Sequence, residues 1–193
     1  MKISRRSFLE QSARTWVALH AGAWAAAAGE RPVEQPVEQP MKLRELRLAA
    51  ARPAELVPFY RDALGFEMLE GRDDAVAFRA GHTRLRFRRT EVTPAPYYHV
   101  AFNIPENKIE RAVEWAGRRF PLIHLAGVGE PIVYFDFIDA HSIYFWDPAG
   151  NLLEFIARHE LANAADGPFD ASDILASSEI GIVVDDVPAT VER

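Results

Sequence analysis

The sequence contains no cysteine in its 193 residues. This absence excludes disulfide frameworks, thiol catalysis, iron–sulfur clusters and zinc sites built from cysteine. Basic residues are fewer than acidic ones, 22 Lys and Arg against 28 Asp and Glu, for a formal net charge of −6. That balance argues against a nucleic-acid partner, because phosphate binding needs clustered Lys and Arg. The hydrophobic content of 49% is ordinary for a globular protein and excludes collagen-like and broadly disordered classes.

The first 28 residues differ in character from the rest of the chain. They hold four basic residues, including Arg5 and Arg6, against a single acid, Glu10, and end in an alanine-rich apolar run. The stretch SRRSFL at residues 4–9 resembles a twin-arginine export signal. The apolar run is too short and too rich in alanine for a membrane span. We therefore expect export to the periplasm or the extracellular space, with a cytoplasmic location as the alternative.

A proline-rich linker follows over residues 29–40, GERPVEQPVEQP, in which PVEQ is repeated. Three prolines without apolar periodicity predict an extended, solvated segment. The globular part is therefore expected to begin near Met41. Removal of residues 1–28, with their four bases and one acid, would change the net charge from −6 to −9.

From residue 41 one order of elements occurs twice. The first copy predicts a strand, a helix and three strands over residues 42–49, 53–64, 66–69, 75–79 and 83–88. The second copy predicts the same order over residues 97–103, 106–119, 132–138, 142–146 and 152–157. Because neither copy closes a core alone, the two are expected to pack as a pair around a shared cavity.

Three segments carry a resemblance to a known family: FYRDALGF at residues 59–66, YHVAF at residues 98–102 and DPAGNLLEF at residues 147–155. With them the chain resembles the vicinal-oxygen-chelate superfamily, which includes glyoxalase I, fosfomycin-resistance proteins, extradiol dioxygenases and bleomycin-resistance proteins. The resemblance implies an α+β domain over residues 41–160. In it, paired βαβββ modules, residues 41–92 and 97–158, form a curved mixed sheet around a central cavity.

The resemblance also implies a metal held by residues on the first and last strands of each module. Carried over position by position, it selects His99 and Glu154 in the second module. Alternation along the strands supports a common face for these two side chains. In the first module the usual histidine position holds Glu45, and the last strand carries Arg84 and Arg86 where a carboxylate would stand.

The expected metal site thus has three ligands, His99, Glu154 and Glu45. Imidazole and carboxylate donors suit a divalent ion such as Mn, Mg, Fe or Zn. The alternative is that Glu45 pairs with Arg86 or Arg84, so that the cavity holds an ion pair and no metal.

Two functions follow from this site. The first is a metal-dependent enzyme in which a divalent ion acts as a Lewis acid on a small oxygen-bearing substrate. Its reaction would be that of a lyase or isomerase, a thiol transfer, or ring-cleaving dioxygenation, and no catalytic residue is assigned. The second is a metal-free protein that sequesters an apolar or aromatic compound, in the manner of bleomycin-resistance proteins. A homodimer is compatible with the fold, because its modules can pair between chains.

Other candidates carry weaker signals. His141 shares a side of its strand with Ile143 and would line the pocket or cap the strand, whereas alternation places Tyr144 on the opposite side. His82, His124 and His159 receive no role. The turn DPAGN at residues 147–151 is interpreted as structural, setting the register of the strand that bears Glu154.

The last part of the chain is predicted as a linker over residues 161–178, followed by the start of an incomplete third module over residues 179–193. A strand and half a helix do not form a module. The segment therefore either adds to the main sheet or to an adjacent subunit, or the sequence is a truncated version of a longer protein, which we favour.

Overall fold

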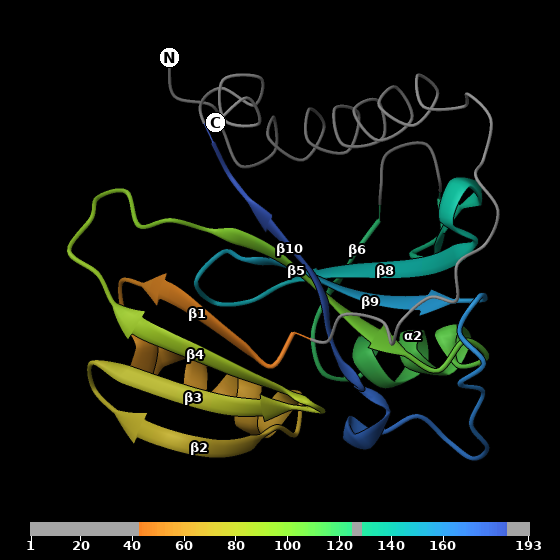
Figure 1. Cartoon of the computed structure of the whole chain (residues 1–193), viewed down its shortest axis with the longest axis horizontal. Helices are drawn as coiled ribbons and strands as arrows, with labels where there is room; N and C mark the ends of the chain where they lie inside the picture. The colour runs from red at the N-terminus through yellow and green to blue at the C-terminus, as the bar shows by residue number, and fades with distance from the viewer. Residues whose placement is uncertain (1–42, 125–128, 185–193) are drawn as a thin grey trace, which may run out of the picture. The chain divides into compact units, whose positions relative to one another are not determined.

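A computed structural model describes residues 43–124 and 129–184 (Figure 1). Within these described ranges, every helix and strand belongs to one unit formed by residues 42–124 and 131–193. The predicted export signal and linker at residues 1–40 lie outside the described residues. No helix in the described ranges is both long and apolar enough to cross a membrane.

The first module forms a four-stranded mixed sheet in the order β1-β4-β3-β2 (Figure 1). Its strands are β1 (Glu45–Ala50), β2 (Glu67–Arg72), β3 (Ala75–Ala80) and β4 (Thr83–Arg89). β1 is parallel to β4, and the other neighbours are antiparallel. Between β1 and β2 the chain makes a 3₁₀ turn (Pro53–Leu56) and a π-helical segment (Pro58–Ala63). Gly65, at φ +73°, follows this segment and ends it as predicted, because positive φ suits glycine.

The second module repeats this arrangement. β5 (Tyr98–Ile104) is parallel to β9 (Leu152–Arg158), which is antiparallel to β8 (Ala140–Trp146). Helix α2 (Ile109–Gly117) follows β5, and the short strands β6 (Leu122–Ile123) and β7 (Val133–Phe135) both pair with β8. The predicted strand over residues 132–138 is shorter than expected, because Asp136–Ile138 turns as 3₁₀ and Asp139 adopts a left-handed φ of 43°. The predicted α+β fold of paired βαβββ modules is confirmed.

One apolar core joins the two modules. Alternate residues of every main strand face it, and the helical segments cover it. Tyr60 of the first module stacks on Phe78 with ring centroids 5.2 Å apart, and Phe66 contacts Phe102 of the second module at 5.9 Å. The opposite faces of the strands are therefore the ones left for polar chemistry.

The tail after β9 belongs to the second sheet. β10 (Ala176–Ile182) pairs antiparallel with the free edge of β5, so residues 179–182, predicted to open a third module, extend the sheet of the second (Figure 1). The expected linker over residues 161–178 holds a 3₁₀ turn (Ala171–Asp173) and the first residues of β10. An open edge of backbone N–H and C=O groups favours such an added strand.

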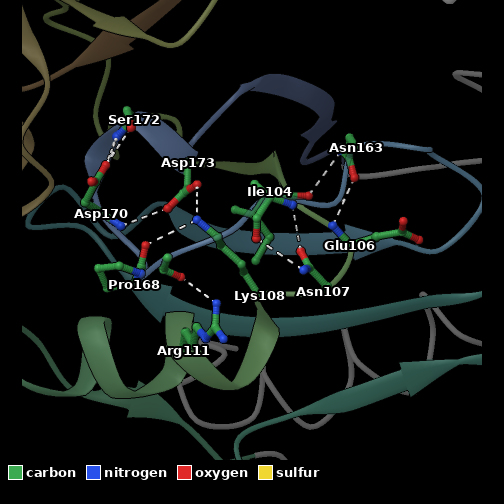
Figure 2. Close-up of polar contacts among 12 residues, drawn as sticks. Ile104, Glu106, Asn107, Lys108, Arg111, Asn163, Pro168, Asp170, Ser172 and Asp173 are labelled. Carbon is green, nitrogen blue, oxygen red and sulfur yellow. Dashed lines mark hydrogen bonds and ion pairs between the residues drawn. The ribbon is translucent and has the colours of Figure 1, made fainter.

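Polar contacts hold this tail against the start of α2 (Figure 2). Lys108, 2% exposed, pairs with Asp173 at 2.7 Å and donates to the carbonyl of Pro168 at 3.2 Å. Asn107 and Ala165 exchange two hydrogen bonds, through the Asn107 amide group. These contacts fix where β10 begins and hence its register on β5. Composition alone gave no signal for them.

Candidate functional site

The second module brings His99 and Glu154 together. Nε2 of His99 lies 2.7 Å from Oε2 of Glu154, and the side chains are 15% and 3% exposed. His99 is on β5 and Glu154 on β9, where Glu154 stands directly opposite Ala101. Both side chains lie on the face away from the apolar core. Val100 follows His99 and Leu153 precedes Glu154, and both of these neighbours point the other way, into that core.

Tyr144 completes a row across this face. It stands on β8 directly opposite Glu154, and its ring centroid lies 6.2 Å from that of His99. Burial raises the pKa of Tyr144 far above its ordinary value, and the neighbouring Glu154 carboxylate raises it further by charge and hydrogen bonding. The hydroxyl therefore keeps its proton across the ordinary pH range and serves as a hydrogen-bond donor.

From the sequence alone Tyr144 receives no role in the site, because alternation places it on the side of its strand opposite His141. The structure confirms that these two side chains point apart, but the site lies on the side of Tyr144. Trp146 pairs with Leu152 across the turn. Tyr144 is two residues before Trp146 and Glu154 is two residues after Leu152, so these two residues also pair across the hairpin. The length of the turn is therefore the sequence feature that could have placed Tyr144 beside Glu154.

A buried polar atom lies in the next row of the same face. Asn103 is two residues beyond Ala101 on β5, and its Oδ1 is buried without a hydrogen-bond partner. A buried acceptor without a partner is costly, by about 1–3 kcal/mol, and often marks a place where a ligand or water binds. The face beside Glu154 is therefore suited to a small polar molecule.

The DPAGN turn fixes the strand that carries Glu154. Asp147 is buried and accepts hydrogen bonds from the Tyr60 hydroxyl at 2.8 Å and from the Asn151 backbone and side chain at 2.8 and 2.7 Å. Asn151 in turn accepts from the backbone N–H of Tyr98 at 3.0 Å. One turn thus ties the helical segment of the first module to the starts of β5 and β9, next to His99.

Glu45, the third predicted ligand, lies in a different environment. Its carboxylate bonds Arg47 at 2.9 Å and lies 3.9 Å from Arg84. The hydrogen bond from Arg47 lowers its pKa, helped by the charges of Arg84 and Arg86. In the part of the chain that the structure describes, no group of three or more His, Asp or Glu side chains is arranged to hold a metal ion. The structure thus brings two of the three predicted ligands together. Glu45 pairs with arginine, but its close partner is Arg47 on its own strand, and of the two arginines named in the alternative Arg84 lies 3.9 Å away.

The aromatic residues that could supply the apolar volume of a binding pocket are Trp115, Trp146, Phe135 and Phe137. Trp115 packs against the core beside Phe120 and Phe155, and Phe135 is 8% exposed. Phe137 is 43% exposed. Trp146 is the one of the four that lies beside the His99–Glu154 pair, because it stands opposite Leu152, which is also the strand partner of His99.

No protein-family model and no curated protein matches this sequence. Solved structures do match. A glyoxalase/bleomycin resistance protein/dioxygenase from Nocardioides has a TM-score of 0.50 at 17% identity, over 78% of this chain and 99% of that one. An integron cassette protein from the mobile metagenome of the Halifax Harbour sewage outfall has a TM-score of 0.50 at 22% identity, over 60% and 97%. A lactoylglutathione lyase from Agrobacterium tumefaciens has a TM-score of 0.47 at 23% identity, over 62% and 95%. At these identities the similarity establishes the fold alone.

Proposed function

We propose that this chain is an enzyme of the glyoxalase type, acting on a small oxygen-bearing molecule at the His99–Glu154 pair. The observation that carries the proposal is the 2.7 Å approach of Nε2 and Oε2 on a face that also carries a hydrogen-bond donor, the Tyr144 hydroxyl. The fold agrees with it, because glyoxalase-like proteins share this architecture. A fold hosts many reactions, so the site has to carry the functional argument.

A divalent ion, which the fold family implies, would be held by His99 and Glu154. An imidazole nitrogen and a carboxylate oxygen are suitable donors for Mn, Fe or Zn, and the partnerless Asn103 Oδ1 leaves a polar position nearby for water or substrate. When bound, such an ion supplies Lewis-acid stabilisation of negative charge on a substrate oxygen. Glu45 would not take part, because its carboxylate is neutralised by arginines.

The residues of the chain itself have distinct roles in this proposal. Without an ion, Glu154, almost fully buried, holds the imidazole of His99 in one orientation through their hydrogen bond, and it thereby keeps the two donor atoms side by side. Tyr144 keeps the proton on its hydroxyl, which is hydrogen-bonded to Glu154, and would turn that hydrogen bond to a substrate oxygen as charge develops there. A substrate bearing neighbouring oxygens fits these groups, in an isomerase or lyase reaction, a thiol transfer or a ring cleavage.

A second candidate is metal-free binding of a small molecule. The observation favouring it is that His99 and Glu154 satisfy each other directly while Glu45 is engaged elsewhere. In this case the protein sequesters a compound without changing it, and substitutions at the pair alter binding alone.

Metal analysis of the full chain, purified from the cytoplasm without an affinity tag, separates the two candidates. In a His141→Ala background, the enzyme proposal expects about one equivalent of a divalent ion, lost in His99→Ala and in Glu154→Gln but kept in Glu45→Gln. Folding of each variant is checked by circular dichroism. Turnover is then assayed with three substrate classes: the thiol adduct of a 2-oxoaldehyde, an epoxide with a thiol, and a catechol. Absence of a stoichiometric ion in the unchanged protein, with no turnover after addition of Mn, Fe or Zn, would leave the binding function.

A further inference from the structure

A second pair of histidines lies outside the site described above. Nδ1 of His141 is 2.7 Å from Nε2 of His159, with the two ring centroids 5.0 Å apart and the ring planes at 76°. Both side chains are half-buried. At this distance one nitrogen carries a proton and donates it to the lone pair of the other. When that proton moves to the other nitrogen of its own ring, both facing nitrogens have a lone pair directed into the space between the rings.

The hairpin of β8 and β9 places the two rings together. His141 stands opposite Ala157, and His159 follows two residues later, in the diagonal position that brings long side chains of neighbouring strands into contact. The backbone N–H of His159 donates to the carbonyl of Asp139 at 2.9 Å, which fixes the chain just after β9. The arrangement is therefore set by strand register and a turn, not by flexible side chains alone.

The surroundings of the pair favour a cation. Tyr134 packs on His141 with centroids 4.7 Å apart, and its hydroxyl donates to Asp139 at 3.0 Å. Through this hydrogen bond the carboxylate of Asp139 lies at the edge of the ring that covers His141, which places negative charge near the pair. Tyr134 is 52% exposed, so the cluster is open to solvent on that side.

We propose that His141 and His159 bind a divalent transition-metal ion, of the class of Zn²⁺, Ni²⁺ or Cu²⁺, at a site separate from the His99–Glu154 pair. Imidazole nitrogen is the preferred donor for these ions in proteins. Bonds of about 2.0–2.1 Å in a tetrahedral site space two ligand nitrogens by roughly 3.3 Å, so the rings need to part by only about 0.6 Å. Water completes the coordination, since the described residues bring no third side chain of the usual ligand types into the group.

Isothermal titration of the full, untagged chain with Zn²⁺ tests the proposal. A His99→Ala/Glu154→Gln background removes the candidate active site, so the outcome does not depend on the proposed function. We expect one equivalent of Zn²⁺ to bind, and to weaken in His141→Ala and in His159→Ala by more than the roughly 10- to 100-fold that loss of an outer-shell partner costs. Mg²⁺, which prefers oxygen ligands, is expected not to bind there.

His82→Ala provides the matched control, because His82 is a histidine in an exposed turn of the first module. It is expected to bind Zn²⁺ as the background protein does. Imidazole NMR signals report the site directly: those of His141 and His159 should shift on Zn²⁺ addition. Unchanged affinity in both single variants, or Zn²⁺ binding without a shift of these signals, would overturn the proposal.

Discussion

The two modules share a topology but carry different chemistry at corresponding positions. In the second, His99 on β5 lies two residues short of the position opposite Glu154 on β9. In the first, the same relation joins Glu45 on β1 to Arg86 on β4. The pair in the second module is therefore an imidazole with a carboxylate, whereas the corresponding positions in the first module hold a carboxylate and a guanidinium.

The surroundings differ as much as the side chains do. Glu154 is 3% exposed, whereas Glu45 is 29% exposed and Arg47 is 69% exposed. Arg86 bonds Glu70 at 2.9 Å, and these two side chains are 20% and 18% exposed, so the ion pairs of the first sheet range from half-buried to open. Exposed ion pairs contribute little to stability because water screens them. We infer that the first module supplies a scaffold with a solvated charged face, and that the second supplies the site.

The largest expected effect concerns charged residues of the two helical elements. Lys108→Met leaves Asp173 buried without its partner and should lower the free energy of unfolding by about 3–5 kcal/mol. In the first module, Arg61→Met removes only the exposed pair with Asp62 and should cost about 1 kcal/mol or less. Urea denaturation measures both, and similar losses in the two variants would remove the distinction between the modules.

Substitutions in the hairpin turns should also lower stability more in the second module than in the first, but by a smaller margin. Asp147→Ala removes the acceptor of the buried Tyr60 hydroxyl and of Asn151, and we expect a loss of about 2–4 kcal/mol. His82→Ala, in the corresponding turn of the first module, should change stability by about 0.5 kcal/mol or less, since its backbone bond to Leu175 is retained. Thermal unfolding followed by circular dichroism compares the two. Equal losses of stability would show that the hydrogen bonds of Asp147 stabilise the second module no more than the exposed His82 turn stabilises the first.

The smallest effect is the contribution of Asp147 to the pH dependence of stability. Burial raises its pKa above the ordinary 3.8, although hydrogen bonds from Asn151 and Tyr60 oppose the shift. The folded state therefore holds this proton more tightly than the unfolded state. The stability due to this group is fully present below pH 3.8 and is lost as the pH rises through the raised value.

Asp147→Asn tests this sign. The stability of the unchanged protein minus that of Asp147→Asn should fall as the pH rises from below 3.8 toward neutrality. A difference that grows with pH would mean that the hydrogen bonds to the carboxylate outweigh its burial. Urea denaturation of both proteins at a series of pH values gives the comparison.

The fold was predictable because periodicity and turn residues are local. Gly65 and the DPAGN turn mark where elements end, and Val100 and Phe102, which alternate with His99 along β5, belong to the core. The pairing of His99 with Glu154 followed from the same alternation, applied to two strands whose neighbourhood the resemblance implied.

The parts that could not be predicted depend on contacts between distant segments. β10 pairs with β5 across some 75 residues, supported by the Lys108–Asp173 pair, and nothing in its composition selects that edge. Whether Glu45 binds a metal or an arginine also depends on side-chain positions, because Arg47 on β1 and Arg84 on β4 both approach its carboxylate. The His141–His159 contact needs the register of β8 on β9, which the sequence alone left open.

The central claim is that the site belongs to the second module, and the imidazole NMR signal of His99 tests it most directly. The signal is assigned with His99→Ala, and Zn²⁺ is added to a His141→Ala background. We predict that the His99 Nε2 signal shifts on addition, that the shift disappears in Glu154→Gln, and that it persists in Glu45→Gln. A His99 signal that does not respond to the ion, or a response abolished by Glu45→Gln and kept in Glu154→Gln, would contradict the account.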